Sequence, residues 1–242
     1  MLIFAHRGAS FEAPENTIAA FSRALDAQAD GIEIDVYPIE DEWLVFHDRY
    51  LARLTAQTGR LHDLTLAQIR TLKVFGQQPI PTLDETLDFI HGRCQVNIEL
   101  KGADIKRGLT RHLRRAVEHA NFQPEQLLVS SFNHHWLAQL KQDHPHQRIG
   151  ALTTSCPLNY AYFAAQLDAW SVHIDVDFVT QEFVDDAHQR GLKVFVFTVD
   201  EPDDMRDLNE MGVDGIFTNH PTLARNVLHG LFVDAREANR WE

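Results

Sequence analysis

The sequence predicts a (β/α)8 TIM barrel, in which parallel strands close into a barrel and helices surround it. Short β-rich runs alternate with longer helical patterns along nearly the whole chain, which is typical of a parallel sheet built from βα units. Eight such units in 242 residues match the size of this barrel. Two strands carry polar residues on one face only, which favours a barrel over an open, doubly wound sheet, the competing architecture. We expect one domain over residues 1–242.

The expected strands are short apolar runs bounded by turn residues. They are Leu2–His6, Gly31–Val36, Gln95–Lys101, Leu127–Ser131, Arg148–Leu152, Ala169–Ile174, Lys193–Val199 and Gly215–Thr218. An extra short strand, Trp43–His47, follows the second of these. Residues from about 48 to 80 are expected to form an insertion, either a lid or a small subdomain. The tail after about Gly230 is expected to extend the last helix.

Capping residues mark several helix boundaries. The first helix is expected after Pro14-Glu15-Asn16-Thr17, a start signal that precedes an apolar stripe. Thr82-Leu83-Asp84-Glu85 has the form of a capping box. Gly191 and Gly212 stand just before strands, where glycine commonly ends a helix. These signals fit the alternation of strands and helices.

Composition excludes several classes of protein. Acidic residues number 35 against 22 basic ones, a net charge of −13 that disfavours binding to nucleic acid and to anionic membrane surfaces. Only Cys94 and Cys156 are present, so a disulfide framework and a cysteine metal site are not expected. The sequence contains no apolar run of membrane-spanning length and no basic leader. We expect a cytoplasmic protein, and the pattern indicates no particular oligomeric state.

Three carboxylates are expected to converge at one end of the barrel. Glu33 and Asp35 share one face of their strand, and Glu99 lies on the polar face of the next barrel strand. At such short distances the carboxylates would repel one another unless a cation lay between them. Oxygen ligands without cysteine suit a hard divalent cation, Mg²⁺ or Ca²⁺. The alternative is that Glu33 and Asp35 form a solvated strand edge.

Two histidines are expected near these acids. His6 follows the first strand, and His47 follows the extra strand near the second. Active sites of such barrels lie at the C-terminal ends of the strands. A pair of histidines can serve as general acid and general base. The pattern does not assign the two roles.

Arg7 and Lys101 are the expected phosphate contacts. An arginine can bind phosphate through two parallel hydrogen bonds, and a lysine offers a compact charge. With three carboxylates, these two cations and one divalent ion, the site would carry a charge of about +1, which suits a phosphodiester monoanion. Thr218-Asn219-His220-Pro221, after the last strand, is expected to be a helix-capping turn.

Several separated motifs resemble one family. They are Ala5-His6-Arg7-Gly8, Pro14-Glu15-Asn16-Thr17, Ala20-Phe21, Ala29-Asp30-Gly31-Ile32-Glu33-Ile34-Asp35-Val36, Val45-Phe46-His47-Asp48, Pro81-Thr82-Leu83, Ile98-Glu99-Leu100-Lys101 and Gly212-Val213-Asp214-Gly215-Ile216-Phe217-Thr218-Asn219-His220-Pro221. Their order and residues resemble the glycerophosphodiester phosphodiesterase family. The resemblance covers almost the entire chain.

The resemblance implies a TIM barrel that uses a divalent metal to hydrolyse glycerophosphodiesters to sn-glycerol 3-phosphate and an alcohol. It maps the family's acid and base onto His6 and His47, its metal ligands onto Glu33, Asp35 and Glu99, and its phosphate contacts onto Arg7 and Lys101. The short length resembles the cytoplasmic bacterial members. Two alternatives remain open at this point. They are cleavage of lysophospholipids in the manner of a phospholipase D, and a barrel that binds metal and phosphate without catalysis.

Overall fold

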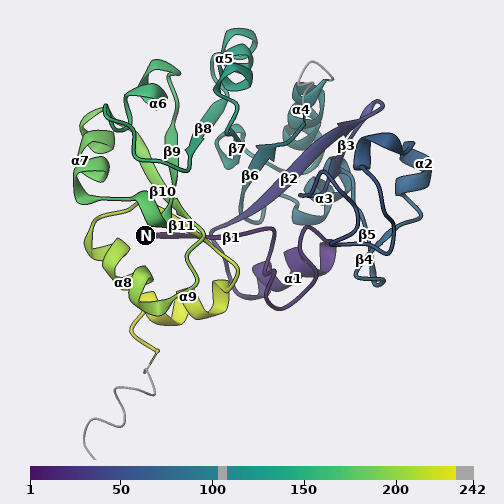
Figure 1. Ribbon diagram of the computed structural model, residues 1–242, viewed down its shortest axis with the longest axis horizontal. Coiled ribbons are helices and arrows are strands. Elements are labelled where there is room, and N and C mark those ends of the chain that lie inside the picture. The colour runs from purple at the N-terminus through teal and green to yellow at the C-terminus, as the bar shows by residue number, and fades with distance from the viewer. Residues whose placement is uncertain (103–107, 233–242) are drawn as a thin grey trace, which may run out of the picture.

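The computed structural model describes residues 1–102 and 108–232, and within them parallel strands close into a barrel (Figure 1). The strands are β1 (Leu2–Ala5), β2 (Gly31–Ile39), β6 (Gln95–Leu100), β7 (Leu127–Ser131), β8 (Arg148–Thr153), β9 (Ser171–Asp175), β10 (Lys193–Phe197) and β11 (Gly215–Thr218). Their order is β1-β11-β10-β9-β8-β7-β6-β2, and the pairing of β1 with β2 closes the ring. The predicted (β/α)8 TIM barrel is confirmed.

Helices surround the strands (Figure 1). They are α1 (Ile18–Asp26), α3 (Leu83–Ile90), α4 (Leu109–His119), α5 (His134–Asp143), α6 (Tyr162–Gln166), α7 (Gln181–Gln189), α8 (Pro202–Glu210) and α9 (Pro221–Leu228). Short 3-10 turns occupy Leu61–Asp63, Pro124–Gln126 and Val176–Phe178. Within the described residues no helix is both long and apolar enough to cross a bilayer.

The predicted helix boundaries follow their capping residues. The hydroxyl of Thr17 accepts the Ala20 N–H, so α1 begins directly after the expected start signal. Thr82 and Glu85 form the predicted capping box at the start of α3. Gly191 and Gly212 have φ values of +77° and +84°, and each follows a helix end, as expected.

Some strand and helix ends differ from the prediction. The strand expected from Ala169 begins at Ser171, because the Ala169 N–H still bonds to Ala164 O at the end of α6. The strand expected to reach Val199 ends at Phe197. The last helix, α9, ends at Leu228, so the expected extension is wrong as far as residue 232, and the rest of that tail lies outside the described residues.

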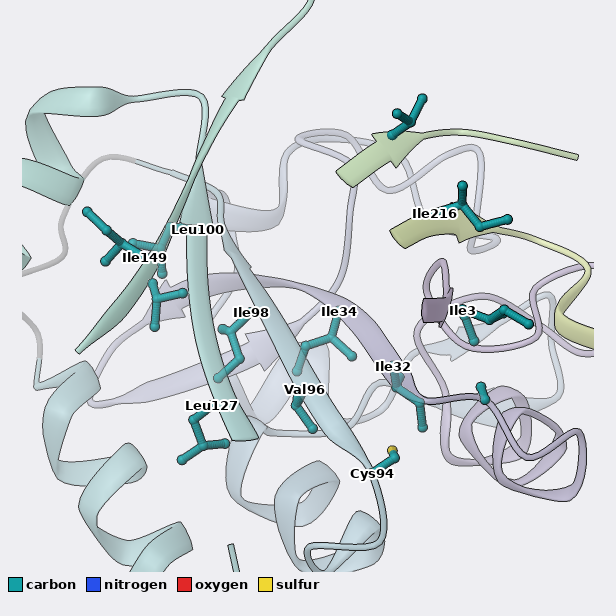
Figure 2. Packing of buried hydrophobic residues seen from close by; sticks show 14 of the residues in the cluster. Ile3, Ile32, Ile34, Cys94, Val96, Ile98, Leu100, Leu127, Ile149 and Ile216 are labelled. Atoms are coloured by element: carbon teal, nitrogen blue, oxygen red, sulfur yellow. The ribbon is translucent and has the colours of Figure 1, made fainter. Parts of the chain in front are cut away.

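Alternation along the strands separates the outer core from the barrel interior. Ile32 and Ile34 of β2 are fully buried beside Val96 and Ile98 of β6, on the face that the helices cover (Figure 2). Side chains one position along each strand point to the other face. The charged residues of these strands therefore lie inside the barrel, near its C-terminal end.

Aromatic rings fill the barrel interior below that end. Phe4, Phe195 and Phe217 form a separate buried cluster, with ring centroids 5.4 to 5.8 Å apart. Glycines make room for two of them, because a Cβ at Gly31 would lie 2.3 Å from the Phe4 ring and one at Gly215 would lie 2.5 Å from the Phe195 ring. This packed floor closes the barrel beneath the acids.

Replacing the central ring should weaken the fold more than the site. We expect Phe195→Ala to lower the free energy of unfolding by about 3–5 kcal/mol, because the change leaves a cavity in a rigid barrel. Urea denaturation at 25 °C measures this loss. The exposed Phe178 provides a control, since Phe178→Ala removes a ring that is 42% exposed. Equal losses in the two variants would contradict the interpretation.

The insertion forms its own hydrophobic cluster beside the barrel. β2 continues past the barrel to Ile39 and pairs with the antiparallel β3 (Glu42–Val45), the predicted extra strand. The insertion contains α2 (Leu66–Ile69), β4 (Lys73–Val74) and β5 (Gln78–Pro79). The buried residues of the insertion and of the β2–β3 pair form one cluster. They are Tyr37, Ile39, Leu44, Phe46, Leu51, Leu54, Leu61, Ile69, Val74 and Ile80. This cluster anchors the chain on either side of His47.

Candidate active site

Three carboxylates meet at the C-terminal end of β2 and β6. The two strands pair in parallel, with Asp35 opposite Glu99. One oxygen each of Glu33, Asp35 and Glu99 lies within 4.8 Å of the others. All three residues are buried, with exposed fractions of 3%, 1% and 8%. The structure therefore brings together the three acids that the sequence predicted as metal ligands.

Burial and mutual repulsion make full ionisation of this cluster costly. Burial, followed by repulsion from Asp35, raises the pKa of Glu99 to about 7. The same causes raise the pKa of Glu33 well above its usual range. Burial would also raise the pKa of Asp35, but Lys101 and then Arg7 attract its carboxylate and hold that pKa below its usual range. A further cation would favour ionisation of the two glutamates.

The donor atoms of the cluster fit a divalent cation. Glu33 Oε1 and Asn97 Oδ1 are buried, and no described residue gives either a hydrogen bond. Asp35 Oδ1 and Glu99 Oε1 lie beside the ammonium group of Lys101. Buried carboxylate oxygens without partners are costly in free energy. An all-oxygen set of this kind suits a hard cation such as Mg²⁺ or Ca²⁺.

Arg7 connects the acid cluster to the loop after β1. Its φ of +58° is the left-handed conformation, and its backbone N–H donates to Glu33 Oε2 at 2.8 Å. The guanidinium lies between two acids, with Nε 3.3 Å from Asp35 Oδ2 and Nη1 2.8 Å from Glu15 Oε1. These contacts hold the guanidinium at the mouth of the barrel, where its other donors can bind an anion.

Lys101 supplies a second fixed positive charge. Its ammonium group lies 3.3 Å from Asp35 Oδ1 and contacts Glu99 Oε1. Burial opposes this charge, but attraction by Asp35 and Glu99 outweighs it and raises the pKa of Lys101 above its usual value. The ammonium also lies 5.8 Å from the ring centre of Phe132, on the loop after β7. The two predicted phosphate contacts thus flank the same acids.

His6 lies directly beyond β1 and lines a pocket together with Glu33 and Glu99. Its Nδ1 lies 2.9 Å from Asn219 Oδ1, on the loop after β11. Burial, and then the charge of Arg7, lowers the pKa of His6 to about 4. The imidazole is therefore neutral at pH 7 and able to accept a proton.

His47 is held by a carboxylate of its own. The Phe46 N–H donates to Asp35 O at 2.9 Å, which places the following residue beside the acid cluster. His47 Nδ1 lies 2.6 Å from Asp48 Oδ1. Hydrogen bonds from Arg53, and to a lesser extent from His47, lower the pKa of Asp48 to about 2 in spite of burial. An ionised carboxylate can only accept, so His47 Nδ1 carries a hydrogen toward Asp48.

The insertion contacts two loops of the site through Arg53. Its guanidinium binds Asp48 at 2.6 and 2.9 Å and Glu15 at 2.7 and 2.8 Å. Asp48 contacts His47, and Glu15 contacts Arg7, so one side chain connects the two loops. Paired bonds from one arginine fix geometry better than single contacts do. The insertion therefore contributes to the order of the site.

The pocket has a polar side and an apolar side. β2, β6 and the end of β1 supply polar groups, and strands β8 to β11 supply the other wall, which is mainly apolar. The lining residues are His6, Glu33, Asn97, Glu99, Leu152, His173, Phe197 and Phe217. An anionic group can lie near the cations while a short carbon chain contacts the rings.

The chain matches one protein family over most of its length. The model of the glycerophosphoryl diester phosphodiesterase family matches residues 6–223, a range that contains all the site residues described above. The chain belongs to this family. The resemblance predicted from the motifs is thereby confirmed, and with it the expected class of enzyme.

Two relatives and one solved structure resemble the chain over most of its length. A glycerophosphodiester phosphodiesterase from Caldanaerobacter subterraneus subsp. tengcongensis is 38% identical, with 94% of this chain and 97% of the relative covered. One from Bacillus subtilis is 30% identical, with 95% and 87% covered. A solved structure, an Oleispira antarctica phosphodiesterase in complex with the product sn-glycerol-3-phosphate, has a TM-score of 0.84 at 28% identity, with 95% and 97% covered.

The sequence did not predict the contacts that three residues, Asn219, Glu15 and Arg53, make in the site. The turn containing Asn219 was expected only to cap a helix, yet the cap residue is His220 and the side chain of Asn219 contacts His6. Glu15 was expected only as part of a helix start, and Arg53 had no expected role. The position of Asn219 after the last barrel strand was a usable signal. Nothing in the local pattern indicated Arg53.

Proposed function

We propose that this protein hydrolyses glycerophosphodiesters to sn-glycerol 3-phosphate and an alcohol in a reaction that depends on a divalent cation. The observation that carries the proposal is the gathering of three buried acids, two fixed cations and two histidines around one pocket mouth. The activities named for the relatives, and the product named for the Oleispira antarctica structure, support it.

Glu33, Asp35 and Glu99 would hold the cation, Mg²⁺ or Ca²⁺, which when bound would offset negative charge on the phosphate oxygens. Arg7 and Lys101 bind the same oxygens from the protein side. Both cations are held by acids before substrate arrives, so little reorganisation is needed in the transition state. The resulting charge of the site, about +1, suits a phosphodiester monoanion.

The two histidines would divide the proton transfers. His6, neutral at pH 7, accepts the proton of the nucleophile. If the nucleophile is water, sn-glycerol 3-phosphate forms directly; if it is the adjacent glycerol hydroxyl, a cyclic phosphate forms and water then opens it to sn-glycerol 3-phosphate. His47, whose Nδ1 is held by Asp48, donates a proton to the leaving alkoxide. One group that accepts a proton and a second that donates one are the combination that general acid–base catalysis requires. The apolar wall that includes Phe197 would contact the carbon chain.

Product analysis tests the reaction directly. With glycerophosphocholine and Mg²⁺ or Ca²⁺, we expect equal amounts of choline and sn-glycerol 3-phosphate, and no turnover after dialysis against EDTA. Release of phosphocholine and glycerol would contradict the proposed bond cleavage. Full turnover in excess EDTA would remove the metal from the scheme. A faster initial rate on lysophosphatidylcholine than on glycerophosphocholine would favour the phospholipase D alternative.

A further inference from the structure

We propose that Asp200 and Asn219 fix the tautomer of His6, so that Nε2 is the atom through which His6 exchanges a proton. The inference rests on the proposed function, because it assigns an atom to a histidine that acts there in proton transfer. Asp200 and Asn219 are positioning residues, since they act through His6. The argument depends on which of their atoms can donate and which can only accept.

Backbone pairing places Asn219 beside His6. β1 and β11 pair in parallel with Ala5 opposite Thr218, and the His6 N–H donates to Thr218 O at 2.8 Å. His6 and Asn219 are the next residues of these two neighbouring chains. Their side chains meet with Nδ1 of the imidazole 2.9 Å from Oδ1 of the amide. The contact therefore follows from the closure of the barrel.

Asp200 sets the orientation of the Asn219 amide. Its carboxylate accepts the Asn219 Nδ2 at 2.6 Å, the Asn219 backbone N–H at 2.8 Å and the Thr218 hydroxyl at 2.9 Å. An ionised carboxylate has no hydrogen to donate, so only the Nδ2 side of the amide can face it. The oxygen then faces away from Asp200. Ser10, whose hydroxyl donates to that oxygen at 2.7 Å, agrees with this orientation.

The orientation of the amide decides the tautomer of His6. An amide oxygen only accepts, so the hydrogen of a neutral His6 must be on Nδ1. Nε2 then carries the lone pair, and among the described residues the hydrogen-bond partner of the ring is at Nδ1, which leaves Nε2 available. His6 itself lines the pocket. When Nε2 takes up a proton, the Nδ1–H bond to Asn219 persists. The chain of contacts from Asp200 through Asn219 to His6, called the relay below, therefore holds the His6 ring in both protonation states.

Asp200→Asn tests the relay, because the new side chain has the same shape but can donate. Its amide can offer N–H to Asn219, whose own amide then turns and presents Nδ2 to His6. Such a contact favours hydrogen on Nε2, which can no longer accept a proton. We expect kcat to fall about 10- to 10³-fold with a much smaller change in KM.

A spectroscopic measurement distinguishes this effect from a structural one. In the Mg²⁺-loaded enzyme with ¹⁵N-labelled histidine, the His6 nitrogens report which atom carries the hydrogen, and His6→Ala identifies their signals. We expect Nδ1–H in the wild type and a shift toward Nε2–H in Asp200→Asn. Asp203→Asn is the matched control, because this carboxylate on α8 is 66% exposed and pairs with Arg206. It should change neither kcat nor the tautomer.

Asn219→Ala provides a second variant if Asp200→Asn does not fold by circular dichroism. It removes the amide oxygen, so both tautomers should become populated and kcat should fall. A wild-type enzyme with hydrogen on Nε2 of His6 would overturn the inference. So would folded Asp200→Asn or Asn219→Ala enzymes with wild-type kcat. The NMR measurement needs no substrate, so it tests the tautomer independently of the reaction. A wild type that releases no sn-glycerol 3-phosphate would contradict the proposed function, while the position of the hydrogen on His6 would still confirm or overturn the inference.

Discussion

His6→Ala is expected to reduce kcat about 10²–10⁴-fold while the protein keeps its fold. The variant removes the proton acceptor proposed for the nucleophile. The backbone hydrogen bond from residue 6 to Thr218 O, 2.8 Å long, does not depend on the side chain and keeps β1 beside β11. The proposed phosphate contacts, Arg7 and Lys101, are unchanged in this variant, so KM should change less than kcat. Steady-state kinetics and thermal unfolding measure the two effects.

His220→Ala is the matched control for this prediction. His220 packs against Phe11, with ring centroids 3.7 Å apart and ring planes tilted by 39°, and is not part of the pocket lining. Its loss should leave kcat unchanged. If His6→Ala instead retained wild-type kcat, the site would not be the catalytic centre, and the barrel that binds metal and phosphate without turnover would become the better interpretation.

The acid cluster could be predicted from the sequence because it depends on local geometry. Alternation along a strand is fixed by the backbone, so the spacing of Glu33 and Asp35 determines that they share a face. Apolar neighbours such as Ile34 show which face the helices cover. Pairing of the next barrel strand then brings Glu99 opposite Asp35. The first two steps use neighbouring residues, and the last step requires only that consecutive strands of the barrel pair.

The contacts that hold the histidines could not be predicted in the same way. Asn219 meets His6 from 213 positions away, and Arg53 meets Glu15 from 38 positions away. The first contact requires the register of barrel closure, and the second requires the fold of the insertion. The pattern of residues 48–80 predicts neither strands nor helices strongly, since its elements are only two to four residues long. Tertiary packing therefore determines the conformation of the insertion and the position of Arg53.

Strand ends were the least accurate part of the prediction for a related reason. Ala169 continues the apolar pattern of a strand, but its N–H bonds to Ala164 O at the end of α6 and not to a neighbouring strand. Hydrophobic periodicity does not distinguish these partners. The site is little affected, because its residues follow from strand faces and from the residues just after the strands.

Removal of the divalent cation is expected to abolish activity and to lower the melting temperature. A ligand that binds only the folded state, present at 100 times its Kd, adds about 2.7 kcal/mol to the free energy of unfolding. For a chain of this size that corresponds to roughly 5–10 °C in Tm. Protein dialysed against EDTA, then titrated with Mg²⁺ or Ca²⁺ while Tm and turnover are measured, should recover both together.

The gain in Tm should depend on pH through the glutamates. In the metal-free protein the pKa of Glu99 is raised from 4.5 to about 7, so the folded state holds a proton there that the unfolded state has lost. Ionisation of Glu99 therefore destabilises the metal-free fold as pH rises from about 4.5 through 7. The cation must displace this proton at pH 5 but not at pH 8. We expect a larger gain in Tm at pH 8.

Paired substitutions locate the cation. Glu99→Gln removes one ligand oxygen charge, so the metal-dependent gain in Tm and the activity should both fall, while the metal-free variant at pH 8 should be more stable than the metal-free wild type because the buried charge is gone. Glu42→Gln is the control, since Glu42, Asp84 and His112 form a second group close enough to hold an ion. Arg115 Nε already lies 3.6 Å from Asp84 there, which disfavours a further cation. Loss of the gain in Glu42→Gln but not in Glu99→Gln would place the ion outside the barrel mouth and contradict the proposed site.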